Sequence, residues 1–186
     1  MLCGAAILWA FVGYCSELLT LYDTRVLEGW DACARVDEGW SVLQRLDVYF
    51  PLTADNCARL TPPLAKIGAF DIVSNLQVLT ASRYLAWTDT INSAAWILVV
   101  LVLEIEVRLQ LKGRLSFAIT RGTRSVKYLL YATLFAASVY WGFEGKFLDF
   151  WDASLWLFAF LFIELNVFDW QRETVGDAAN RTPEPA

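Results

Sequence analysis

A run of basic residues between two apolar stretches constrains this chain most. Residues 108–127 hold six Lys or Arg side chains and no Asp or Glu, although the whole chain has a formal net charge of −5. The flanking residues 94–103 and 128–143 are almost entirely apolar. Because an excess of Lys and Arg in a short loop sets the orientation of membrane proteins, the pattern predicts a cytoplasmic loop between two transmembrane helices.

The composition points to the same class of protein. Hydrophobic residues make up 57% of the 186 positions and aromatic residues 15%, both high for a soluble domain. Four apolar segments can cross a bilayer if flanking Trp and Lys side chains extend the shorter ones: residues 1–22, 92–111, 128–143 and 153–168. The sequence therefore predicts an all-α membrane protein with four transmembrane helices and an outer polar region between helices one and two.

The order of segments then follows from the loop. We expect a first transmembrane helix (1–22), an extracytoplasmic region (23–90), a three-helix transmembrane region (91–170) and a disordered cytoplasmic tail (171–186). Within the outer region, apolar spacing at 41–50 and 67–85 predicts short amphipathic helices. With the basic loop in the cytoplasm, both chain ends are cytoplasmic as well, and the expected location is the cell membrane.

Two features stand out in the polar region. Cys33 and Cys57 form a disulfide only if this region faces an oxidising space. A short motif also repeats at ten-residue spacing, as Glu28-Gly29-Trp30 and again as Glu38-Gly39-Trp40. The repeat either marks two turns that place two indoles against the membrane surface or arises by chance, because two copies are too few for a repeat architecture.

The residue types that are rare or missing in this chain exclude several kinds of catalytic and metal-binding site. The chain has no His and one Met, which removes imidazole metal ligands, Ser-His or Cys-His catalytic pairs and Met-rich copper sites. No CxxC motif, Gly-rich phosphate loop or nucleophile elbow occurs. We therefore expect a non-enzyme that binds no metal and no cofactor.

Carboxylates inside the apolar segments are the candidate site residues. Glu104 has Arg108 four residues later, in the favourable order for a pair on one helix. Glu164 has only apolar neighbours on its own helix, so Arg124 or Lys127 are its candidate partners. These five residues form a candidate intramembrane polar network. A charged group at membrane depth indicates function, but a structural ion pair explains each of these acids as well.

Two main functions remain open at this stage. The first is a non-catalytic subunit or scaffold of a membrane assembly, with the bilayer and a membrane protein or a second copy as partners, and no nucleic acid. The alternative is an ion or proton pathway that uses Glu164 and Glu104. A lipid-modifying enzyme that uses outer carboxylates has least support, because helix capping explains those acids. The basic loop is either a plain topology determinant or a surface for anionic lipid head groups.

Overall fold

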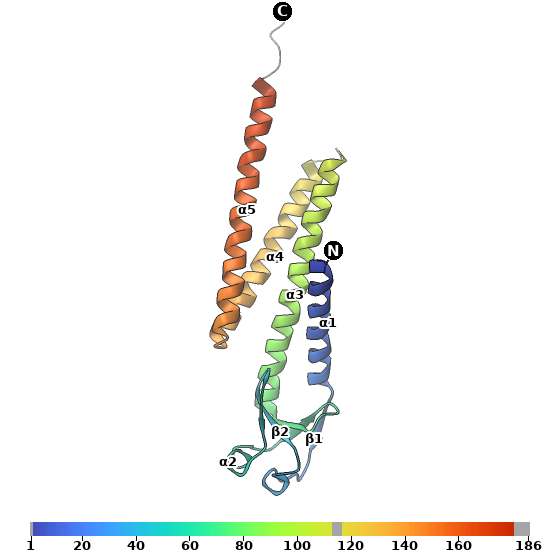
Figure 1. Cartoon of the computed structure of the whole chain (residues 1–186), viewed down its shortest axis with the longest axis vertical. Helices are drawn as coiled ribbons and strands as arrows, with labels where there is room; N and C mark the ends of the chain where they lie inside the picture. The colour runs from blue at the N-terminus through green and yellow to red at the C-terminus, as the bar shows by residue number, and fades with distance from the viewer. Residues whose placement is uncertain (1, 113–116, 181–186) are drawn as a thin grey trace, which may run out of the picture. The chain divides into compact units, whose positions relative to one another are not determined.

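A computed structural model describes the backbone of residues 2–112 and 117–180 and the side chains of residues 5–112 and 119–163 (Figure 1). The chain divides into two compact units, Met1–Leu130 and Tyr131–Ala186.

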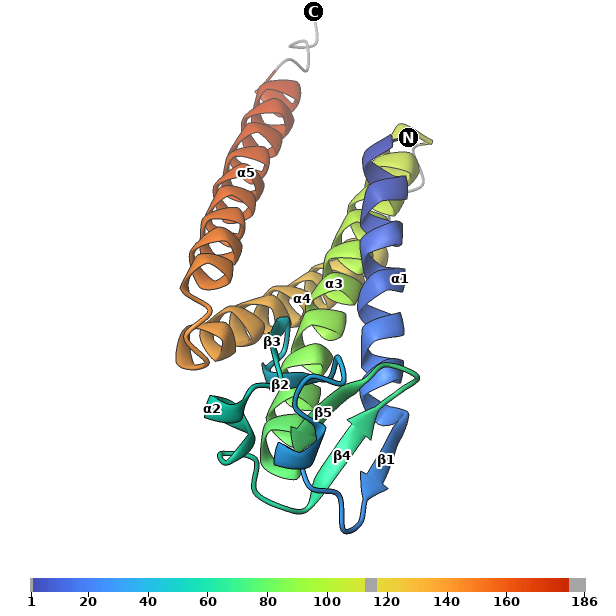
Figure 2. The same cartoon turned by 60° about the horizontal axis from the view of Figure 1, so that its bottom comes forward.

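The first unit contains a small sheet and the helices that lead into and out of it. Its elements are α1 (Leu2–Tyr22), β1 (Thr24–Leu27), the short 3-10 helix η1 (Cys33–Arg35), β2 (Ser41–Arg45), β3 (Val48–Pro51), α2 (Ala54–Cys57), β4 (Leu64–Ile67), β5 (Ile72–Asn75), α3 (Leu76–Leu111) and the first part of α4 (Phe117–Phe143). Figure 2 shows the sheet at one end of α1 and α3.

The five strands form one sheet in the order β1-β4-β5-β2-β3. The pairs β1–β4, β4–β5 and β2–β3 are antiparallel, and β2–β5 is parallel. The β2–β3 hairpin is tight, and Asp47 in its turn has a positive φ of 65°. Two of the four connections between strands are short, residues 46–47 and 68–71, whereas residues 28–40 and 52–63 are longer and contain η1 and α2.

A compact core and a disulfide hold this sheet region, residues 23–75, together. The buried hydrophobic residues of the core are Ala32, Val42, Leu52, Cys57, Leu64 and Val73. Cys57 is bonded to Cys33, so η1 is tied to α2 across the core. The disulfide expected for an oxidising space is therefore present in the structure.

The repeated Glu-Gly-Trp motif forms two turns that meet. Gly29 and Gly39 have positive φ values of 66° and 84°, a conformation that glycine adopts without a steric penalty. The rings of Trp30 and Trp40 then stack edge to face, with centroids 5.0 Å apart, against the core of the sheet region. The interpretation as turns is confirmed, whereas the indoles pack on each other inside the sheet region.

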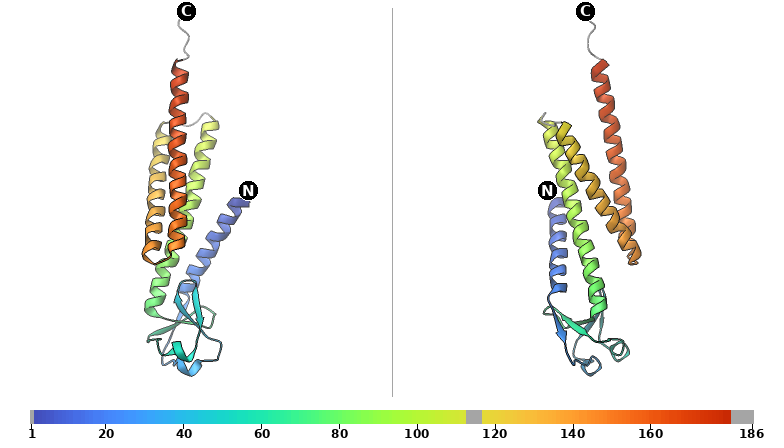
Figure 3. Two further views of the ribbon diagram at one scale, coloured as in Figure 1. Left: turned by 60° about the vertical axis from the view of Figure 1, so that its left-hand side comes forward. Right: turned by 180° about the vertical axis from the view of Figure 1, so that it is seen from behind.

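Helices α1 and α3 pack side by side where they leave the sheet (Figure 3). The guanidinium of Arg83 donates to the backbone oxygen of Leu21 at 2.9 Å and to Thr24 Oγ1 at 3.1 Å. The Trp87 indole donates to the Tyr22 hydroxyl at 3.1 Å. The side chain of Asn75 caps α3 by accepting a hydrogen bond from the Val78 backbone N–H.

The second unit contains the end of α4 and α5 (Phe147–Asn180), joined by a turn in which Gly145 has a φ of 76°. The hydroxyls of Ser138 and Ser154 lie 3.0 Å apart. Gly142 leaves room for the ring of Phe150, since a Cβ at this glycine would lie 3.3 Å from that ring. Small residues on α4 therefore let α5 approach closely.

The expected all-α architecture with four transmembrane helices is wrong. The fold is mixed α/β with a five-stranded sheet, and within the described residues only one helical segment, Ala5–Tyr22, is long and apolar enough to cross a membrane. Residues 41–50, expected as an amphipathic helix, form β2 and β3, while residues 67–85 contain β5 and the start of α3.

The boundaries of the long helices also differ from the expectation. Helix α3 begins at Leu76, well before the expected start near residue 92, because Asn75 caps it there. Helix α5 continues to Asn180 and so includes most of the segment expected as a disordered tail. The remaining residues of that tail, 181–186, lie outside the described part of the chain.

Candidate functional site

An ion pair between two helices is the central polar feature of the long-helix region. Lys127 of α4 lies with its Nζ 3.1 Å from Glu106 Oε2 of α3. The Lys127 side chain is 7% exposed and that of Glu106 is 20% exposed. Taking both charges out of water is costly, so the pair is maintained only because each group neutralises the other. It fixes the end of α3 against the start of α4.

The candidate network predicted from the sequence is only partly assembled. Glu104 pairs with Arg108 on the same helix, at 2.6 Å between Oε1 and Nε, and both side chains are more than half exposed. Lys127, expected near Glu164, pairs with Glu106. The side chain of Glu164 lies outside the described residues. Arg124 is exposed, in the second turn of α4.

Glu106 is the member that sequence reasoning missed. It lies on the opposite face of the helix from Glu104, so its partner had to come from another element. The available signal was the position of Lys127 at the start of the next apolar stretch, because a lysine there is close in space to the end of the preceding helix. The connection between α3 and α4 is short enough to allow this contact.

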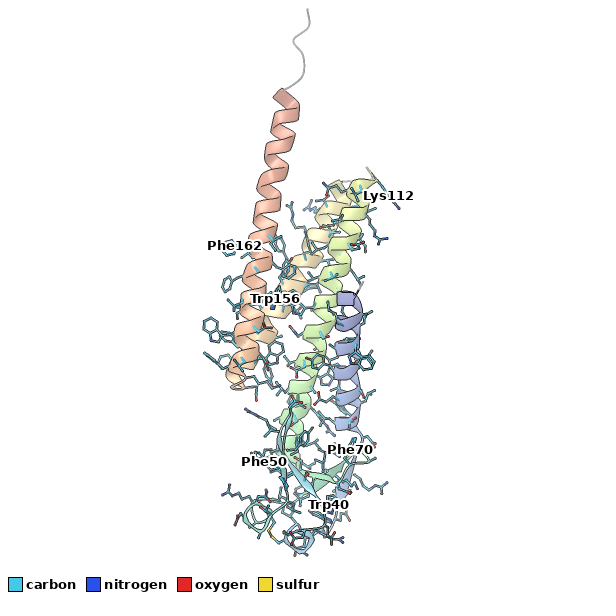
Figure 4. All side chains as sticks on the ribbon, in the orientation of Figure 1. Trp40, Phe50, Phe70, Lys112, Trp156 and Phe162 are labelled. Carbon is cyan, nitrogen blue, oxygen red and sulfur yellow. A yellow bond between two sulfur atoms is a disulfide. The ribbon has the colours of Figure 1, made fainter. Side chains whose placement is uncertain are left out.

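Four exposed bases lie within two helical turns of this ion pair along α3 and α4, and together with it they form what we call the cationic end. Arg108 and Lys112 belong to the end of α3, while Arg121 and Arg124 belong to the first turns of α4. The chain has no Asp or Glu between Glu106 and Glu144. Figure 4 shows Lys112 at the end of α3 remote from Trp40 in the sheet region.

A second polar group lies inside α3 nearer the sheet. Ser82, Asp89 and Ser93 are buried and recur at spacings of seven and four residues, so they share one face of the helix. The hydroxyl of Ser82 has no hydrogen-bond partner among the described residues. The sequence reasoning placed Ser82 and Asp89 in the outer polar region and Ser93 in the transmembrane region that follows, which concealed the pattern.

The sheet region carries an open groove, with a volume of about 540 Å³, beside the first Trp turn. Two of its charged residues have partners within the chain. Asp31 accepts a hydrogen bond from the Cys33 backbone N–H, and Arg35 pairs with Glu38. Glu28 also lines the groove and is exposed.

Tyr49 lies in β3, the second strand of the β2–β3 hairpin. Burial raises the pKa of the Tyr49 phenol above its usual value, and the negative charges of Glu17 and Asp47 raise it further. Glu17 belongs to α1, so the hairpin and this helix interact electrostatically.

None of these groups has the composition of a metal centre. Within the part of the chain that the structure describes, no three Cys, Asp or Glu side chains are placed to hold a metal ion. Comparisons of the chain with protein-family models, with curated proteins and with solved structures found no match.

Proposed function

We propose that this protein is a non-catalytic subunit or scaffold of an assembly at a lipid bilayer, and that α1 is the segment that enters the bilayer. The observation that carries the proposal is the apolar surface of α1. Its exposed side chains include Leu8, Val12, Leu19 and Trp9, and the last is 83% exposed. Exposed apolar surface of this extent marks a region that another molecule covers.

The other long helices add to this surface. On α3, α4 and α5 the exposed large apolar side chains include Leu101, Leu111, Phe135, Phe143, Leu155 and Phe162. Such apolar surfaces suit contact with lipid acyl chains or with the apolar faces of protein partners. A scaffold role also suits a chain without His and with no metal-ligand group among its described residues.

The ion-pathway alternative has no observation in its favour. Glu104 is exposed and paired with Arg108 on its own helix, which is the ordinary arrangement of a surface ion pair. The side chain of its proposed companion, Glu164, is outside the described residues. We therefore keep a single proposed function.

Fractionation of cells that express the full chain tests the proposal. We expect the protein in the membrane pellet, resistant to alkaline carbonate, and in mild detergent we expect it with itself or with other membrane proteins. The variant Leu8→Asp/Val12→Asp places two charges on the exposed face of α1 and is expected to release protein from the pellet. The matched control, Gln44→Asp/Thr53→Asp, changes exposed positions of the sheet region.

Two outcomes contradict the proposal. One is wild-type protein found in the high-speed supernatant without detergent. The other is a strictly monomeric, partner-free species in mild detergent.

A further inference from the structure

We infer that the cationic end of α3 and α4 is a binding surface for the head groups of anionic phospholipids. The inference rests on the proposed function, since it names the lipid class that the protein contacts at the bilayer. It starts from the Glu106–Lys127 ion pair, which brings the two helix ends together.

The ion pair sets the positions of the surrounding bases. Lys112 and Arg121 are each six residues from it, on α3 and α4, so both lie about 9 Å beyond it along their helices. Arg108 and Arg124 lie between these positions and the ion pair. Two helices therefore present their bases at matching levels.

The local charge balance leaves this surface positive. The two acids nearest to this surface in the sequence are already engaged, since Glu104 pairs with Arg108 and Glu106 with Lys127. The exposed side chains of Lys112 and Arg121 belong to a stretch with no further acid for more than fifteen residues. Phosphate groups are the anions that match such a cluster, and each Lys or Arg near a membrane adds to the attraction.

The apolar neighbours select lipid over other phosphate-bearing partners. Leu111 is 82% exposed beside Lys112, and Val107, Val126 and Leu129 are exposed within two turns of the bases. A surface that mixes bases with exposed aliphatic side chains suits the boundary between head groups and acyl chains. Nucleic acid would leave this apolar surface uncovered.

The test measures lipid preference with the full chain in mild detergent. Phosphatidylglycerol with a fluorophore on its acyl chain is titrated with protein, and binding is followed by fluorescence anisotropy. Phosphatidylcholine with the same fluorophore is the reference. We expect tighter binding of phosphatidylglycerol, and weakening of that preference as salt is raised.

The main variant is Lys112→Gln/Arg121→Gln, which avoids both ion-paired bases. We expect its affinity for phosphatidylglycerol to fall about fivefold for each base removed, with phosphatidylcholine binding unchanged. The control Arg45→Gln/Arg59→Gln removes the same charge from exposed positions of the sheet region and is expected to bind as the wild type does. Equal thermal unfolding of the variants excludes a loss of fold as the cause.

Three results overturn the inference. The first is equal binding of the two lipids by the wild type. The second is an equal loss of phosphatidylglycerol binding in the control variant, and the third is displacement of the lipid by a single-stranded oligonucleotide at lower concentration. If the protein is in the membrane pellet but shows no lipid preference, this inference fails while the proposed function stands.

Discussion

The ammonium of Lys127 and the carboxylate of Glu106 form an ion pair across two helices, 3.1 Å apart and largely removed from water. Replacement of Lys127 by Met leaves the carboxylate half of the pair without its counter-charge. We expect a loss of about 3 kcal/mol in the free energy of unfolding, the size typical of a broken buried pair. Chemical denaturation followed by circular dichroism measures it.

The double variant Glu106→Gln/Lys127→Met separates the energy of the ion pair from the energy of each side chain's other contacts. It is expected to lose less stability than the sum of the two single variants, because neither charge is then stranded. The exposed pair provides the control: Glu104→Gln is expected to cost at most about 0.5 kcal/mol. Additive losses at Glu106 and Lys127 would show that the pair does not couple α3 to α4.

The ion pairs of this region also show which contacts can be predicted from the sequence and which cannot. The Glu104–Arg108 pair depends only on helical spacing, and it forms at the predicted positions. Lys127 was expected only as a candidate partner for Glu164, and its ion pair with Glu106 depends on which faces of α3 and α4 meet. Those faces are set by the packing of many side chains, so spacing along the chain could not predict the contact between Lys127 and Glu106.

The sheet was missed for a related reason. Its strands are four or five residues long, and β1 pairs with β4 across a separation of about forty residues. Such short segments carry little periodicity, and Ser41–Arg45 has apolar positions that also suit a helix. The turns at Gly29 and Gly39 and the disulfide were accessible, because turn chemistry and cysteine position are local features of the sequence.

The disulfide gives a second prediction. Cys33 and Cys57 are separated by 24 residues, and closing a loop of that length restricts the unfolded chain. We expect the variant Cys33→Ala/Cys57→Ala to lose about 3 kcal/mol of stability in the sheet region. Thermal unfolding with and without a reducing agent measures the effect.

The same experiment contains its own control. The double variant no longer has the bond, so a reducing agent is expected to lower the unfolding temperature of the wild type and leave that of the variant unchanged. An equal response in both proteins would mean that the reductant acts elsewhere, and the disulfide would then have no role in stability.

Tyr49 gives a pH-dependent prediction. Its pKa is raised in the folded state by burial and then by Glu17 and Asp47, so the folded protein holds the phenolic proton more tightly than the unfolded chain does. Stability from this group is therefore fully present below the unfolded pKa of about 10 and is lost as the pH rises through the folded pKa.

Tyr49→Phe removes this dependence. We expect its unfolding temperature to fall less than that of the wild type between neutral pH and strongly alkaline pH. Glu17→Gln removes one source of the shift and is expected to give an intermediate response. Parallel curves for Tyr49→Phe and the wild type would assign the alkaline loss of stability to other groups.

Two glycines of α4 give a matched pair of substitutions with different expected results. A Cβ at Gly122 meets no atom within 4 Å, so Gly122→Ala removes backbone freedom from the unfolded chain without a clash. We expect a gain of about 1 kcal/mol in the free energy of unfolding. A Cβ at Gly142 would lie 3.3 Å from the Phe150 ring, so Gly142→Ala must displace this ring.

We therefore expect Gly142→Ala to gain less than Gly122→Ala or to lose stability, since overpacking opposes the gain in helix propensity. The variant Gly142→Ala/Phe150→Leu has a smaller side chain opposite the new methyl group and is expected to tolerate the alanine better than the single variant does. Denaturation curves of the three proteins decide the point. An equal gain at Gly122 and Gly142 would mean that Phe150 moves freely, and the close approach of α5 to α4 would then not depend on the glycine.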